Sequence, residues 1–382
     1  GQLNETMVLQ PVVNLSADGT SAFGRWRIFA MRGLHGASAS WHEAAVHAEY
    51  VFEGEWKIAR QWIEERVAVP CEGSWGRNPL DMLKTLPDPA FPPDGEAAPI
   101  GPQAGLPLPL LAPYAVPAGS LADRLGAAVD VEHLICHFGY LNDIRAWDDV
   151  AALFSAGGLL AYGPRGGYRG QDKIRAVLHT FGSPGLRANE IANRMQVQPI
   201  VHVSADGKEA AVRTRSIMQL NASGKPLFGD AVNEFRLVRD AGRWRIASLS
   251  ILPTFLSDLD RGIVGGLLPL PGAGRDPVPD LPPQMTDPEP LAAFLPPFHY
   301  AHPVTGAPMG RIAGSAASGA AADSRMPGWQ VEAGEDGELA RLADTRALET
   351  LQRTYGYLVD KALWRDATDL FAEDGTLEIG GR

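Results

Sequence analysis

The chain has few cysteines and no long apolar run, and both absences narrow what it can be. Its 382 residues include only Cys71 and Cys136. Two cysteines so far apart neither staple a fold nor build a metal site, so both are expected to be free thiols. No apolar run reaches the roughly 18 residues that a membrane-spanning helix needs. No signal peptide is visible at residue 1, which favours the cytoplasm and leaves the periplasm open.

Positive charge and nucleotide-binding motifs are also scarce. The chain has 34 Lys and Arg against 45 Asp and Glu, for a net charge of −11. Because no basic face is clustered, a nucleic-acid partner is not expected. The sequence contains no phosphate loop, no dinucleotide-binding glycine fingerprint and no nucleophile elbow. The expected partner is therefore a small molecule, with no cofactor and no membrane.

What the chain does have is a stretch that occurs twice, as Gly139–Phe154 and Gly356–Phe371. Steps of three and four residues separate a tyrosine, an aspartate and a tryptophan in each copy, which places the trio on one helical face. These residues are Tyr140, Asp143 and Trp147 in the first copy and Tyr357, Asp360 and Trp364 in the second. Either the motif closes a helix pair or it points an acid into a pocket.

Periodicity and turn signals predict the elements around this stretch. Strands are predicted over residues 7–13, 22–31, 41–52, 56–66, 159–162, 195–203, 210–220, 230–239, 243–252 and 377–379. Helices are predicted over 129–154, as two helices, over 171–181, and as a pair over 345–371, with a glycine turn at 166–170. With 45% hydrophobic residues, a chain of this length can bury two cores.

The N-terminal strands match the later ones, with Pro11 aligned to Pro199 and Ser16 to Ser204 (199 − 11 and 204 − 16 both give 188). Residues 341–382 plus 1–70 are therefore predicted to form one split domain that lacks its third helix, and residues 127–258 a complete one. The proline- and glycine-rich segment 71–126 is predicted to be a surface linker, and 259–340 a proline-rich tail with a flexible segment.

The first half of the split domain thus lies at the C-terminus and its second half at the N-terminus, and three explanations are open. The chain could be circularly permuted, its segments could be printed out of native order with a loop left out, or its ends could complete domains in neighbouring molecules. We favour a native order of 326–382, a loop and then 1–325, because Met326 follows a small-residue stretch typical of a C-terminal tail. In each case residues 341–382 and 1–70 are expected to pack as one domain. Separately, the two units are expected to pack sheet against sheet as a pseudo-dimer within the chain. A homo-oligomer is a further possibility.

The order of helix, helix, short strand, glycine turn, helix and four-stranded meander resembles the SnoaL-like branch of the nuclear-transport-factor-2-like superfamily. The tail Pro296–Pro303 also resembles that of two-domain bacterial members. The resemblance implies an α+β fold of two cones, each a strongly bent, mainly antiparallel sheet that wraps helices around an apolar pocket. Members include polyketide cyclases, scytalone dehydratase, ketosteroid isomerase and lyases of lignin-derived aromatics, while others only bind ligands. The fold therefore does not fix an activity.

The resemblance places Asp143 and Asp360 at a pocket-facing position. Burial beside aromatic rings would raise the pKa of such a carboxyl group, which could then move protons. The alternative is a capping role at the start of the next helix. The split domain also has His35, His42 and His47, whereas Leu227 and Val232 are aligned with the last two in the central domain. The predicted catalytic residues are accordingly Asp360, Tyr357, His47 and His42.

The predicted substrate-binding residues are Arg25, Trp26, Trp364, Tyr140, Asp143 and Arg213. Arginines that share a strand face can bind a carboxylate or phenolate, although surface or ion-paired arginines are the more common case. His133 and His137 have a metal-compatible spacing but no third clustered ligand, so no metal is expected. His299 and His302 lie in the proline-rich tail and are expected to be structural or exposed.

These observations favour a cofactor-independent lyase, dehydratase or isomerase that acts by acid–base chemistry on a mid-sized apolar, aromatic or polycyclic molecule. The alternative is a non-catalytic protein of the same fold that binds a ligand or a partner. Ionisable groups that converge in a closed pocket would favour the enzyme, and a wholly apolar or filled pocket would favour the alternative.

Overall fold

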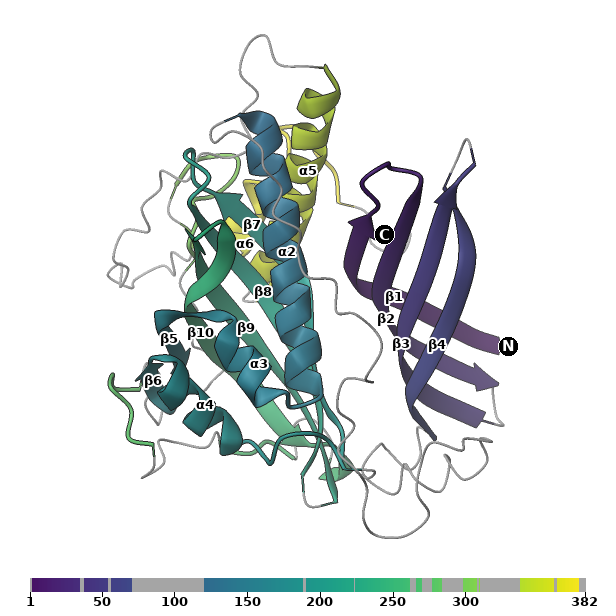
Figure 1. The fold of residues 1–382 in the computed structure, drawn as a ribbon, viewed down its shortest axis with the longest axis vertical. Coiled ribbons are helices and arrows are strands. Elements are labelled where there is room, and N and C mark those ends of the chain that lie inside the picture. Colours follow the sequence, from purple (N-terminus) through teal and green to yellow (C-terminus); the bar gives the residue numbers. More distant parts are fainter. Residues whose placement is uncertain are drawn as a thin grey trace.

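A computed structural model describes residues 2–34, 38–53, 56–70, 120–187, 190–222, 224–261, 266–269, 277–283, 298–307, 309, 337–360 and 363–377. His35, Cys71, Met326 and almost all of the predicted linker lie outside these ranges. The described part is an α+β fold with two bent sheets (Figure 1), which confirms the predicted class. No helix in these ranges is long and apolar enough to cross a membrane.

Sheet A is an antiparallel meander of the four N-terminal strands. These are β1 (Gln2–Leu15), β2 (Ser21–Leu34), β3 (Ser38–Phe52) and β4 (Trp56–Pro70), paired in chain order. Each contains a strand predicted from the alternation of apolar and polar residues, and each is longer than predicted. The polar turn after β1 is closed by Asp18, whose carboxylate accepts from the Thr20 backbone amide.

Sheet B has six strands and covers the middle of the chain. They are β5 (Phe154–Tyr162), β6 (Gly166–Arg169), β7 (Ala192–Val203), β8 (Glu209–Ala222), β9 (Lys225–Asp240) and β10 (Arg243–Asp258). Their order is β6-β5-β10-β9-β8-β7, and only the β5–β10 pair is parallel. The stretch predicted as a glycine turn at 166–170 forms the edge strand β6 instead.

Three helices cover one face of sheet B, which we call its inner face. They are α2 (Leu121–Asp143), α3 (Trp147–Ala152) and α4 (Gln171–His179). Helix α2 begins eight residues before the predicted start at 129 (129 − 121), and the linker therefore ends before residue 126. The reason is a capping box in which Ser120 and Asp123 each accept from the other's backbone amide. An aspartate fills the place usually held by Glu or Gln.

The main core lies between these helices and the inner face of sheet B. It includes Val131, Phe138, Trp147, Phe154 and Phe235, all almost completely buried. Phe138 of α2 meets Phe235 of β9 edge-to-face, with 5.5 Å between ring centroids. Burial of this much aromatic surface holds α2 onto the sheet and positions the end of α2 over the strands that follow.

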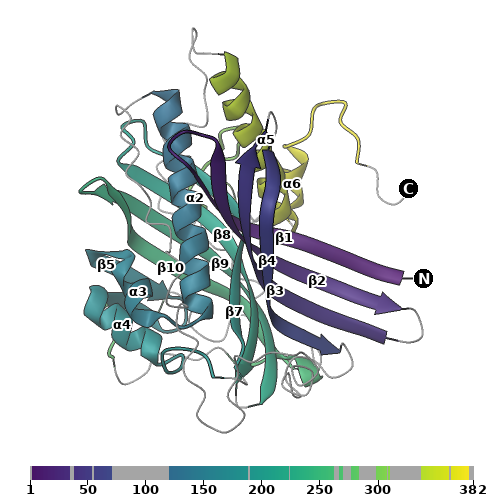
Figure 2. The ribbon, with the colours of Figure 1, turned by 45° about the vertical axis from the view of Figure 1, so that its right-hand side comes forward.

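Sheet A lies beside α2 and sheet B (Figure 2). It contacts them through the face that carries Arg25 and Arg27, which we call its outer face. Val12 of β1 packs with Cys136 and Tyr140 of α2. Farther along, Val67 of sheet A packs with Ile191, beside Trp41 and Phe228. Sheet A therefore rests partly on α2 and partly on sheet B.

The C-terminal helices α5 (Gly337–Asp360) and α6 (Trp364–Thr368) pack on the outer face of sheet B, opposite α2 to α4. Their core includes Ile200, Val232, Tyr357 and Leu358, with Phe298 and Tyr300 from the tail. The principal contacts of α5 among the described elements are with α6, β7 and α2. Leu377 lies outside any strand, and the rest of the strand predicted over 377–379 falls outside the described residues.

Candidate functional site

A cavity of about 130 Å³ lies between α2 to α4 and the inner face of sheet B. Most of its lining is apolar and much of it aromatic. The apolar residues are Phe138, Trp147, Val150, Phe154, Leu160, Leu178, Phe181, Met218, Leu220, Ile251 and Leu256. A cavity of this size takes about one aromatic ring. The predicted apolar pocket is therefore present, in the central unit.

Polar side chains meet on one wall of this cavity, where β7, β8 and β9 run side by side. Asn233 donates to Gln196 Oε1 at 2.8 Å and lies 2.6 Å from Ser216 Oγ. Gln196 in turn donates to Ser216 Oγ at 2.9 Å, and Thr214 donates to Gln196 Oε1 at 2.8 Å. The carbonyl oxygen of Asn233 is buried with no hydrogen-bond partner in the described structure, so it can accept from a ligand.

Arg194 and Tyr162 are the two ionisable residues in the described lining. The Arg194 guanidinium donates to the Ala192 carbonyl at 3.2 Å, and it forms no ion pair with a carboxylate within the described ranges. Burial lowers its pKa to about 10, so it is a cation at neutral pH. Burial raises the pKa of Tyr162, partly opposed by Arg194 and Arg165, so its hydroxyl stays a donor. The cavity therefore offers positive charge and donors to a negative or carbonyl oxygen.

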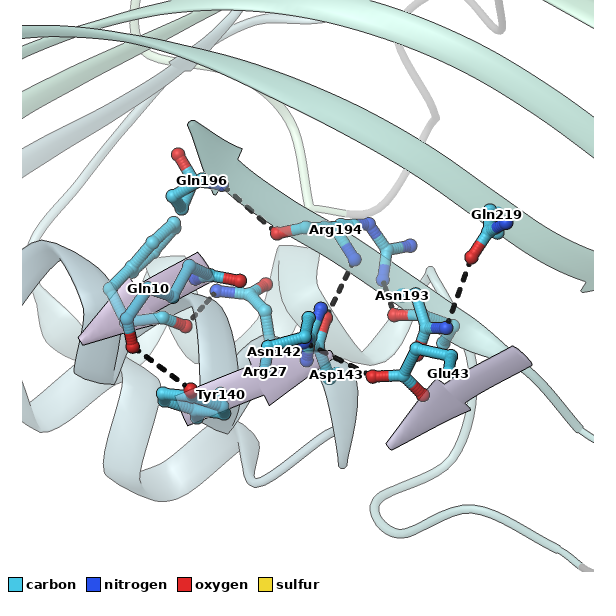
Figure 3. A network of polar contacts seen from close by, with 12 residues as sticks. Gln10, Arg27, Glu43, Tyr140, Asn142, Asp143, Asn193, Arg194, Gln196 and Gln219 are labelled. Carbon is cyan, nitrogen blue, oxygen red and sulfur yellow. Dashed lines mark hydrogen bonds and ion pairs between the residues drawn. The ribbon is translucent and has the colours of Figure 1, made fainter. Parts of the chain in front are cut away.

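Arg194 is held in place from below by Asp143, the last residue of α2 (Figure 3). Asp143 Oδ1 accepts from the backbone amide of Arg194 at 2.6 Å, while Oδ2 pairs with Arg27 of sheet A. Arg27 Nε also lies 3.1 Å from Glu43 Oε1. All three side chains of this ion cluster are buried, and burial lowers the pKa of Arg27 while Glu43 opposes the shift.

The structure places Asp143 in neither of its two predicted roles, the pocket-facing acid and the helix cap. It neither lines the cavity nor caps the next helix, because α3 has no side-chain cap. Tyr140, one turn earlier, donates to the Gln10 carbonyl at 3.0 Å. Arg25 lies 4.3 Å above the Tyr140 ring, and burial lowers the pKa of this arginine. Tyr140, Asp143 and Arg25 together join α2 to sheet A.

Tyr357 and Asp360 make the corresponding contacts at the other end of the chain. Tyr357 donates to the Gln198 carbonyl at 3.1 Å, and Asp360 pairs with Arg215 of β8. Arg213 lies 4.9 Å from the Tyr357 ring. These residues join α5 to the outer face of sheet B, so Tyr357 and Asp360 lie with sheet B whereas the two catalytic histidines predicted with them lie in sheet A.

His42 and His47 are separated from each other as well as from Asp360. His42 lies 2.8 Å from Glu65 Oε1, and His47 stacks on Trp62 with 5.6 Å between ring centroids. Burial, followed by the charge of Arg25, lowers the pKa of His47. The expected convergence of an aspartate, a tyrosine and a histidine in one cavity is therefore not seen in the described structure.

The strand register also corrects the alignment behind the histidine prediction. His47 pairs with Arg25 in sheet A, and Glu234 pairs with Arg213 in sheet B. The counterpart of His47 is therefore Glu234 and not Val232. Three residues separate the last paired positions of β2 and β3, and two separate those of β8 and β9. The two hairpins therefore differ in length by one residue. The predicted alignment had assumed a difference of three.

None of the ten predicted site residues lines this cavity. Trp26 donates to the Tyr50 hydroxyl at 2.8 Å in sheet A, and Trp364 is exposed. The sequence carried only a weak signal for the missed residues. Arg194 and Gln196 are two apart on one strand, so alternation places both on the same face. The apolar Met195 and Val197 alternate with them, a pattern that is equally typical of a solvent-facing side, so it did not indicate a pocket.

The tail histidines prove to be structural. His299 lies between Glu234 Oε2, at 2.8 Å, and His202 Nδ1, at 3.0 Å, and Glu234 also pairs with Arg213. His302 Nε2 lies 2.8 Å from the Asp366 carbonyl. No cluster of three potential metal ligands occurs among the residues that the structure describes, and burial lowers the pKa of both His133 and His137.

A bent sheet, its covering helices and an apolar cavity with a polar wall together define an α+β cone. Residues 123–250 and 340–382 match the model of the SnoaL-like domain. No curated protein is detectably similar in sequence. Among solved structures, an NTF2-like protein with a cystatin-like fold from Novosphingobium aromaticivorans is 19% identical over 33% of this chain and 81% of its own, with a TM-score of 0.29. ActVI-ORFA from Streptomyces coelicolor is 19% identical over 32% and 95%, with a TM-score of 0.29.

Proposed function

We propose that the central cavity binds a small, mostly apolar aromatic molecule through one negative or carbonyl oxygen held by Arg194. The main observation is the half-buried guanidinium of Arg194, which pairs with no described carboxylate, in a cavity lined mostly by aromatic and aliphatic side chains. A cation that is partly withdrawn from water without a counter-ion is costly, and an anionic ligand oxygen would offset that cost. The cavity volume favours a substituted single ring over a polycycle.

As an enzyme, the site would be a cofactor-independent lyase, dehydratase or isomerase of the SnoaL-like type. In such reactions negative charge accumulates on an oxygen as an enolate or phenolate forms. Arg194 would stabilise that charge, and the Tyr162 hydroxyl, kept protonated by burial, would donate a hydrogen bond or a proton to it. Asn142 and the Gln196 cluster would orient the ring substituents.

A second candidate, binding without turnover, is favoured by one specific observation. The described lining contains no Asp, Glu or His, so the group that would remove a proton from carbon is not among these residues. The two candidates share the binding step and differ in whether the ligand is changed. Binding and turnover must therefore be measured separately.

The binding step is tested with matched ligand pairs, such as hydroxybenzoates and cinnamates against their methyl esters. We expect the acids to bind about tenfold or more tightly, because only they pair with Arg194. Arg194→Met should remove this preference, while Arg175→Met, on the exposed surface of α4, should keep it. Equal binding of acid and ester to the unaltered protein, measured by calorimetry, would refute the proposal.

The chemical step is tested by screening the bound compounds for turnover without added cofactor. If the site is catalytic, Tyr162→Phe should lower kcat by about a hundredfold with little change in KM. Turnover that is untouched by both Tyr162→Phe and Arg194→Met would place the chemistry elsewhere. Binding without turnover across the panel would select the second candidate.

A further inference from the structure

The two sheets correspond strand by strand, which allows their faces to be compared. Val8 pairs with Ile28 in sheet A, as Gln196 pairs with Ser216 in sheet B. Trp26 pairs with Val46 as Thr214 pairs with Asn233. The inner face of sheet A, opposite to Arg25 and Arg27, is thus the counterpart of the face of sheet B that lines the cavity.

On sheet A this counterpart face is apolar where sheet B is polar. Gln196, Ser216 and Asn233 are replaced by Val8, Ile28 and Val46. Val8 and Ile63, on the edge strands β1 and β4, are each 56% exposed, whereas Val46 of the central strand β3 is only 2% exposed. The inner face of sheet A therefore has the composition of a packing surface rather than of a pocket wall, and part of it is open to solvent.

Helices α5 and α6 show the complementary exposure. In the repeated stretch Trp147 is 1% exposed while its counterpart Trp364 is 62% exposed. Sixteen residues earlier (147 − 131 and 364 − 348), Val131 is fully buried and its counterpart Leu348 is 68% exposed. In the central unit these positions pack helix to sheet, and in the C-terminal helices the same positions have an open face.

Gly139 of α2 and Gly356 of α5 are equivalent positions, and their surroundings show which contact α5 lacks. A Cβ on Gly139 would come within 2.6 Å of Gln10 in sheet A and within 3.2 Å of Gln196 in sheet B, so α2 lies tightly against both. A Cβ on Gly356 would meet only Gln198, at 2.9 Å. The partner that corresponds to Gln196 is Val8, and α5 makes no such close approach to it among the described residues.

We propose that the inner face of sheet A is covered by α5 and α6 of a second copy of this chain. Within one chain, α5 is held on sheet B by Tyr357 and Asp360, and sheet A is held on α2 by Arg27. Two copies related by a twofold axis would satisfy both open faces at once, each giving its helices and receiving the partner's. This inference is independent of the ligand proposed above.

The proposal is tested by the mass of the chain in solution. We expect light scattering and sedimentation to give twice 40.9 kDa. Val8→Asp, on the sheet, and Leu348→Asp, on the helix, should each weaken the dimer about tenfold or more, because each places a charge in an apolar contact. Val304→Asp changes an equally exposed valine outside both faces, and it should leave the dimer intact.

A mixing experiment distinguishes exchanged helices from any other dimer. In a heterodimer of the Val8→Asp and Leu348→Asp chains, one contact carries both substitutions and the other carries neither. An equimolar mixture should therefore dimerise more strongly than either variant alone. A monomeric unaltered protein, a dimer that resists both substitutions, or a mixture no stronger than its parts would each overturn the proposal. Circular dichroism of each variant confirms that the fold is retained.

Discussion

His202 is a buried histidine whose neutral state is built into the fold. Its Nδ1 lies 3.0 Å from His299 Nε2, and His299 Nδ1 lies 2.8 Å from Glu234. The simplest consistent tautomers let His202 donate to His299 and His299 donate to Glu234, which also pairs with Arg213. Burial, with a smaller contribution from His299, lowers the pKa of His202 to about 3.

This pKa shift predicts how stability depends on pH. Between about pH 6.5 and the folded pKa of about 3, the unfolded chain binds a proton at His202 that the folded chain does not. Stability should therefore fall with decreasing pH in that window, by up to about 1.4 kcal/mol per pH unit from this group. Urea unfolding at pH 7.5, 6 and 5 measures the slope. His202→Asn should flatten the slope, and His179→Asn, on an exposed position, should not. An unchanged slope in His202→Asn would contradict the assignment.

At the residue scale the sequence identified the contact-making side chains but not their roles. Tyr140, Asp143 and the arginine pairs were selected because they repeat, and they do form two matching contacts. Repetition marks what two units have in common, whereas the cavity is lined by residues in which they differ, such as Arg194 and Gln196. One unrecognised difference in hairpin length then hid the equivalence of His47 and Glu234.

At the scale of elements, the join between α2 and sheet A depends on the ion cluster around Asp143. Asp143→Asn removes one charge from a fully buried cluster and leaves Arg27 with less compensation. We expect a loss of about 2–3 kcal/mol in the free energy of unfolding. Asp360→Asn, at an exposed ion pair, should cost less than about 1 kcal/mol. Chemical denaturation measures both.

The matched control for these two substitutions is Asp148→Asn, which breaks an exposed pair with Arg175 and should have almost no effect. Equal losses for Asp143→Asn and Asp360→Asn would mean that the buried cluster contributes no more than the surface pair. The expected ranking, with Asp143→Asn the most destabilising and Asp148→Asn the least, concerns the free energy of unfolding and is separate from any effect on turnover.

Strand and helix types were predictable because apolar spacing is a local property. Sheet A and the strands after residue 192 follow alternation, and α4 begins at the predicted residue. Boundaries were harder, since Ser120 and Asp123 extend α2 by a capping box that apolar spacing does not reveal. Which sheet a helix covers was not predictable at all, because both sheets present similar strands to it.

At the scale of the whole molecule, net charge opposes the proposed dimer. Each chain carries −11, so two copies repel one another over the Debye length, which is about 10 Å at 0.1 M salt. Raising NaCl from about 20 mM to about 300 mM should therefore strengthen association several-fold, since the contact itself is apolar. Sedimentation at several salt concentrations measures this. Weaker association at high salt would indicate an ionic interface instead of the apolar faces of sheet A and α5.

The two carboxylate oxygens of Asp143 connect the cavity of the central unit with sheet A. One oxygen fixes the strand that carries Arg194, and the other fixes Arg27 in sheet A. If a ligand in the cavity changes the hold of Asp143 on Arg194, occupancy of the cavity and docking of sheet A are thermodynamically linked through this carboxylate. By reciprocity, a ligand that tightens the hold on Arg194 must make sheet A harder to detach, by the same factor that detaching sheet A weakens the ligand.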